Sequence, residues 1–77
     1  MSVTIRTGPY EATISNYEWR CQDKSFRGAL NTDLGMWGPS GDDPNPDLNA
    51  AEHAVERFGG RIVEVNQSIK FDPKKVY

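Results

Sequence analysis

His53 and Cys21 are the only histidine and the only cysteine of the chain, and such side chains are well suited to acid–base, nucleophilic or metal chemistry. His53 falls among polar residues of a predicted helix over 46–58, near Arg57, which is an ordinary setting for a solvated helix face. It has no Cys, Ser or second His partner that the sequence reveals. Cys21 takes a core-facing position in a predicted strand, where an inert buried thiol is expected. We therefore predict no catalytic residue, no metal site and no cofactor, and we do not expect an enzyme.

The acidic residues gather in one part of the chain. Residues 31–56 hold six carboxylates and no Lys or Arg, although the whole chain has a net charge of only −2. The same stretch contains Trp37, and tryptophan is strongly enriched at interface hot spots. Such a surface would attract a basic partner, for example a protein complex that binds nucleic acid. The predicted partner-binding surface consists of Asp33, Met36, Trp37, Asp42, Asp43, Asp47, Glu52 and Glu56.

Two other interpretations of this stretch stay open. The acids can simply line a solvated loop and helix face. Trp37 can also fold back to fill the core, because a domain of 77 residues has little apolar surface to spare.

Three arginines form an alternative, basic surface. Arg6, Arg20 and Arg27 fall on outward positions of predicted strands. This set would suit a small antitoxin-like or nucleic-acid-binding regulator. The acidic isoelectric point argues against direct nucleic-acid binding, because dedicated nucleic-acid binders usually contain a strongly basic domain.

The elements that must position these residues begin with short strands. Alternation of apolar and polar residues predicts strands at 3–6, 10–15 and 17–21, and a further strand at 26–30. The last two would form a hairpin that turns at Asp23-Lys24, with Arg20 opposite Arg27.

A loop and a helix follow. Residues 31–45 are predicted to form a long acidic loop rich in Gly and Pro. Asn45 as N-cap, Pro46 at the first helical position and Gly59-Gly60 at the end predict a helix over 46–58. Its apolar stripe toward the sheet consists of Leu48, Ala51, Val55 and Phe58.

A final strand is predicted at 61–71, with Val63 and Val65 facing the core, and a loose tail at 72–77. The order β-β-β-loop-α-β predicts one small α+β domain over 1–77, with two layers. In it, a three- or four-stranded antiparallel sheet is covered on one face by a single helix. No apolar run approaches the length of a membrane span, so no membrane partner is expected. We further expect a monomer or weak homodimer.

Three segments carry a resemblance to known small proteins: Gly8-Pro9-Tyr10-Glu11-Ala12-Thr13, Trp19-Arg20, and Leu48-Asn49-Ala50-Ala51-Glu52-His53-Ala54. In layout and size, over residues 8–65, the chain resembles small phage-encoded anti-CRISPR proteins of type I systems. This resemblance implies a compact α+β inhibitor, in the cytoplasm of a bacterial host, that binds a CRISPR–Cas (Cascade-like) complex and blocks nucleic-acid engagement. The chain is also similar to antitoxins of the HicB type, which share the Tyr-x-Ala strand opening and the Ala-rich helix.

Overall fold

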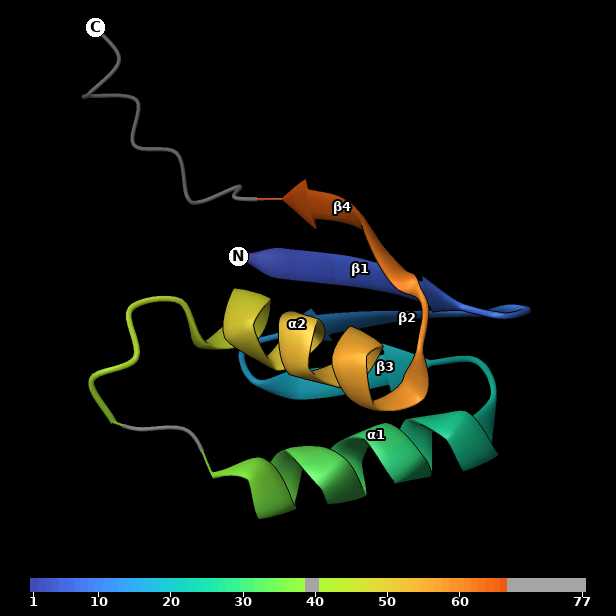
Figure 1. The fold of residues 1–77 in the computed structure, drawn as a ribbon, viewed down its shortest axis with the longest axis horizontal. Helices are drawn as coiled ribbons and strands as arrows, with labels where there is room; N and C mark the ends of the chain where they lie inside the picture. Colours follow the sequence, from blue (N-terminus) through green and yellow to red (C-terminus); the bar gives the residue numbers. More distant parts are fainter. Residues whose placement is uncertain (39–40, 67–77) are drawn as a thin grey trace, which may run out of the picture.

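Four antiparallel strands form one open sheet in the computed structural model, which describes residues 1–38 and 41–66. The strands lie side by side in the order β3-β2-β1-β4, with two helices beside them (Figure 1). The strands are β1 (Ser2–Thr7), β2 (Tyr10–Ser15), β3 (Glu18–Cys21) and β4 (Arg61–Asn66). The predicted class, a small α+β domain with an antiparallel sheet, is confirmed.

The first three strands form a meander whose inward residues make the core. Val3 pairs with Ile14, which in turn pairs with Trp19, and all three side chains are buried. The turn between β2 and β3 consists of Asn16 and Tyr17, which both have positive φ values, 53° and 63°. A two-residue turn of this hand matches the twist of the two strands that it joins.

The segment after β3 is helical, and here the sequence prediction is wrong. The α1 helix (Lys24–Trp37) replaces both the predicted strand at 26–30 and the first half of the predicted loop at 31–45. Asp23 is its N-cap rather than a hairpin loop residue, because its carboxylate accepts the backbone N–H of Phe26. Gly38, in a left-handed conformation with φ 58°, ends the helix.

The α2 helix (Pro46–Phe58) has the predicted bounds, and its predicted stripe packs against the core, but its most buried residues are alanines. Its buried apolar residues are Ala50, Ala51 and Ala54, whereas the larger members of the predicted stripe are only half-buried. Small side chains let the helix axis approach the sheet closely, which leaves the bulkier ones at the flanks. Those flanking residues are Leu48, Val55 and Phe58.

The two helices cover different parts of the sheet. α2 packs on the inner face against β1, β2 and β4, while α1 lies along β3 (Figure 1). The domain therefore has two helices where one was predicted. On the outer face of the sheet, the side chains of β1, β2 and β3 are polar. Thr4 and Thr13 lie at its centre and are joined by a hydroxyl hydrogen bond of 2.9 Å.

β4 differs in register from the predicted strand. A bulge between its pairings with Thr4 and Ile5 places Ile62, rather than Val63, opposite the core residue Ile5. Val63 is consequently exposed. The rest of the predicted strand, 67–71, and the predicted tail, 72–77, lie outside the described residues.

Candidate functional site

An open groove lies at the β3 side of the sheet. Its volume is about 1280 Å³. Its walls are formed by the end of β1, the first half of β2, β3 and the first half of α1. The three arginines of the predicted basic surface, Arg6, Arg20 and Arg27, all line it. The structure therefore brings together the residues of the alternative site. It does so by a different route, because Arg27 comes from a helix and not from a strand opposite Arg20.

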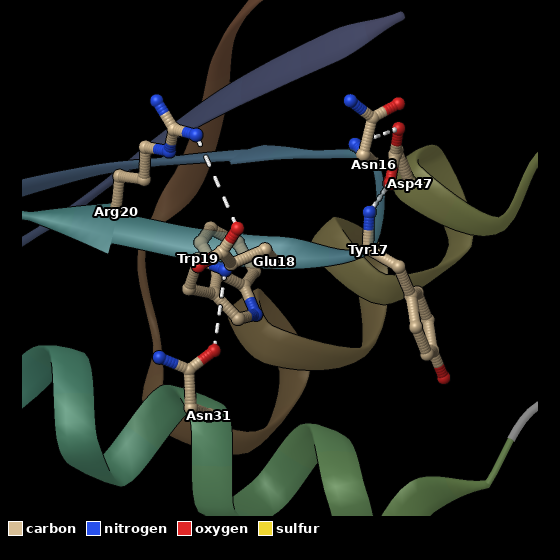
Figure 2. A network of polar contacts seen from close by, with 7 residues as sticks. All are labelled: Asn16, Tyr17, Glu18, Trp19, Arg20, Asn31 and Asp47. Atoms are coloured by element: carbon tan, nitrogen blue, oxygen red, sulfur yellow. Dashed lines mark hydrogen bonds and ion pairs between the residues drawn. The ribbon is translucent and has the colours of Figure 1, made fainter.

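Helix periodicity explains the α1 wall. Asp23, Arg27 and Asn31 are spaced four residues apart, so they follow one side of the helix, and all three line the groove. Asn31 also fixes the distance between the helix and the strand. Its side-chain oxygen accepts the backbone N–H of Trp19 at 3.2 Å (Figure 2). This bond satisfies a donor on the edge strand that would otherwise be unpaired.

The arginines of the groove are weakly engaged within the chain. Arg6 lies 3.6 Å from Glu11, and Arg20 lies 4.0 Å from Glu18, with all four side chains about half exposed or more (Figure 2 shows the second pair). Exposed ion pairs of this length contribute about 0–1 kcal/mol. Arg27 makes no ion pair with any described residue. All three guanidinium groups can therefore accept an external anion at little cost.

The predicted acidic surface is not one surface, because half of its carboxylates serve internal contacts. Asp47 is only 7% exposed, and its two oxygens accept the backbone N–H groups of Asn16 and Tyr17 at 3.1 and 2.7 Å (Figure 2). It thereby holds the β2–β3 turn against the start of α2. The assignment of Asp47 to a partner-binding surface is wrong.

Asp33 belongs to a contact between the two helices. Its carboxylate lies 3.0 Å from Nε2 of His53 and 3.1 Å from Nε of Arg57. The imidazole ring of His53 also stacks on Trp37, with ring centroids 5.1 Å apart. The description of His53 as part of a solvated helix face is therefore wrong, although none of these contacts is to a Cys, Ser or second His. Trp37 is half-buried and packs against the core cluster, as the core interpretation of this residue expected.

Asp43 caps the segment that precedes α2. One of its oxygens accepts the backbone N–H of Asn45 and the side-chain amide of Asn49. Its charge also acts on Tyr17, whose pKa is raised first by burial and then by this carboxylate. The Tyr17 hydroxyl oxygen is buried and has no hydrogen-bond partner among the described residues.

The remaining members of the predicted acidic surface are exposed. Glu52 and Glu56 lie on the side of α2 that points away from the sheet, and Asp42 lies in the segment before this helix. Met36, on α1, is 81% exposed. Of the eight residues predicted to bind a partner, these four are the exposed ones.

Several groove residues were missed by sequence reasoning. The sequence prediction placed Asn31 in a loop and Asp23 in a hairpin turn, and it gave Gln22 no role in a site. One signal could have found them, because Phe26, Leu30, Leu34 and Trp37 recur at the spacing of an amphipathic helix. That helix places residues 23, 27 and 31 on a common side.

Within 1–38 and 41–66, no group of three or more His, Cys, Asp or Glu residues is arranged to hold a metal ion. No helix in the same ranges has the length and apolar character needed to cross a membrane. Compared with protein-family models, with curated proteins and with solved structures, the chain gave no match in any of the three.

Proposed function

We propose that this chain is a non-enzymatic protein-interaction module that binds a carboxylate-bearing segment of a partner protein in the arginine groove. The observation that carries the proposal is the presence of Arg6, Arg20 and Arg27 around one open groove. A guanidinium group presents its donors in a fixed planar fork that matches a carboxylate. Arg27, without an internal ion pair among the described residues, is the expected anchor.

The charge balance of the groove favours a protein segment over a nucleic acid. Three acids, Glu11, Glu18 and Asp23, line it together with the three arginines, so its formal charge is zero. A nucleic-acid backbone gains most of its affinity from uncompensated positive charge. A peptide with spaced charges can instead pair with arginines and avoid the acids.

A second candidate surface is the helical layer, that is, the solvent-facing side of the two helices that cover the inner face of the sheet. Glu52 and Glu56 make no ion pair with described residues, and Met36 is 81% exposed beside this layer. An exposed methionine and unpaired carboxylates within one helical layer suit a basic protein surface. The partner implied by the anti-CRISPR resemblance, a CRISPR–Cas complex in a bacterial cytoplasm, belongs to this second candidate.

The test is a titration of isotope-labelled protein, followed by backbone amide shifts, with three probes of equal length. They are a peptide of alternating Glu and Ser, a peptide of alternating Lys and Ser, and oligothymidylate. We expect the acidic peptide to move the amides of β3 and the first half of α1. Arg27→Gln should weaken this binding, whereas Lys24→Gln, which removes an exposed charge from the same helix outside the groove, should not.

Each other outcome has a defined meaning. Groove shifts with oligothymidylate but not with the acidic peptide would favour the nucleic-acid regulator. Shifts at Glu52 and Glu56 with the basic peptide alone would favour the helical layer. The absence of groove shifts with the acidic peptide would refute the proposal.

A further inference from the structure

The two edge strands of the sheet have different neighbours. At the β3 edge, α1 lies alongside the strand, and Asn31 accepts the N–H of Trp19. At the other edge, β4 pairs with β1 and with no other strand among residues 1–38 and 41–66. An uncovered edge strand presents a row of backbone donors and acceptors that can pair with another strand.

The β4 edge also exposes two large apolar side chains among the described residues. Val63 and Val65 are 40% and 43% exposed, and they alternate along the strand with the exposed polar residues Arg61 and Glu64. On the inner face, the half-buried residues Leu48 and Val55 lie on the side of α2 opposite to His53 and Arg57, which contact α1. This places the two apolar side chains next to β4. A strip of β-branched and aliphatic surface therefore continues from the strand onto the helix.

We propose that β4 pairs antiparallel with β4 of a second copy of this chain, across a two-fold axis perpendicular to the sheet. In the register that we infer, Ile62 lies opposite Val65 of the second copy, and Val65 lies opposite its Ile62. The bulge makes this register self-consistent, since Ile62 and Val65 pair with the core residues Ile5 and Val3 and so share the inner face. The two sheets join into one, and the apolar strips of both α2 helices meet above the junction.

Charge complementarity on the outer face supports a second copy as the occupant. Arg61 and Glu64 lie on the outer face, opposite Arg6 and Thr4 of β1, and neither makes an ion pair with a described residue. In the same register, Arg61 is the diagonal neighbour of Glu64 of the second copy. Diagonal pairs of long side chains are within reach of each other. The two-fold axis produces this pair twice.

The first experiment measures sedimentation of the full chain over a range of concentrations. We expect a monomer–dimer equilibrium, and we expect Val65→Lys to weaken it by about tenfold or more, because a charge then enters the desolvated centre of the junction. Met36→Lys, an equivalent change at another exposed apolar residue, should leave it unchanged. Circular dichroism will show that both variants fold. A wild-type chain that stays monomeric up to about 1 mM would overturn the proposal.

The second experiment tests the register. Arg61→Glu and Glu64→Arg should each dimerise more weakly than the wild type, because like charges then meet across the junction. An equimolar mixture of the two variants should form a heterodimer more strongly than either variant alone, since each new charge meets its opposite. A mixture that behaves as the average of its components would refute this register. Both experiments measure association of two copies and not binding in the arginine groove, so their failure would leave the proposed function untouched.

Discussion

The carboxylate of Asp47, in the first turn of α2, accepts the backbone N–H of Tyr17 at 2.7 Å, in the turn between β2 and β3. The second oxygen accepts the neighbouring N–H of Asn16. Both turn residues have positive φ, a conformation that disfavours residues other than Gly, Asn and Asp. One buried carboxylate thus connects the sheet to the helix and stabilises a turn that is strained at Tyr17.

Asp47→Ala should destabilise the fold by about 2–3 kcal/mol, because two charge-assisted hydrogen bonds are lost and two N–H groups stay part-buried without an acceptor. Chemical denaturation measures this change, with the same dependence of the unfolding free energy on denaturant concentration required for the variant and the wild type. Glu52→Ala is the control, and a solvent-exposed acid on the same helix should change stability by no more than about 0.5 kcal/mol. Equal effects of the two substitutions would contradict the structural role of Asp47.

Two glycine-to-alanine substitutions should have opposite signs. At Gly60, φ is +116° and a Cβ would collide with the carbonyl oxygen of Arg6, so Gly60→Ala should destabilise by about 2 kcal/mol or more. At Gly35, inside α1, a Cβ would meet open space, so Gly35→Ala should stabilise by about 0.5–1 kcal/mol. Thermal unfolding of both variants distinguishes the signs. A destabilising Gly35→Ala would count against the assignment of α1.

Tyr17→Phe should flatten the loss of stability at alkaline pH. Burial and the charge of Asp43 raise the pKa of this phenol above its ordinary value of 10.0. Above that pH, the unfolded chain releases the proton more readily than the folded chain, so stability is full below about pH 10 and falls as pH rises further. The difference between wild-type and variant unfolding free energies, measured at pH 8 to 11 or so, isolates this residue.

At neutral pH the same variant should be as stable as the wild type or slightly more so. The hydroxyl that it removes is buried without a hydrogen-bond partner among the described residues. A destabilisation of about 1 kcal/mol or more would reveal a partner for this hydroxyl.

Asp33 and His53 should be coupled in a double-mutant cycle. We expect Asp33→Ala and His53→Ala to be less than additive, with a coupling free energy of about 0.5–1 kcal/mol, because their contact is partly shielded from water. Combining Asp33→Ala with Glu52→Ala should give additive effects, because these residues share no contact. Additivity in the first cycle would mean that the 3.0 Å contact contributes nothing to stability.

Local signals explain why α2 was predicted to the residue, whereas the helical spacing of apolar residues in α1 was outweighed by opposing signals. Asn45, Pro46 and the Gly59-Gly60 pair mark the ends of α2 without ambiguity. In α1, Gly28 and Gly35 lower the helix propensity. The alternation in the preceding strands also favoured the prediction of a further strand at 26–30. Packing against β3 outweighs this low propensity, and sequence periodicity alone does not reveal such packing.

The site was predictable only in part for a related reason. The strand alternation identified Arg6, Arg20 and Arg27 as candidates, but the position of Arg27 beside the other two depends on where α1 packs. Conversely, the acidic stretch looked like a surface because the partners of its carboxylates come from elsewhere in the chain. Asn16 and Tyr17 precede Asp47 by about thirty positions, and Arg57 lies just beyond the acidic stretch of residues 31–56.

The α1 helix beside β3 also limits how far the sheet can grow. If both edges were bare, joining through β4 would leave a free strand at each end, and further chains could add without limit to form a fibril. With α1 along β3, the described residues offer only the β4 edge for addition, and polymerisation would stop after the pairing proposed above. Substitution of Asn31 should therefore cause insolubility and thioflavin-positive aggregation at high concentration. This effect should exceed any change in the stability of a single chain.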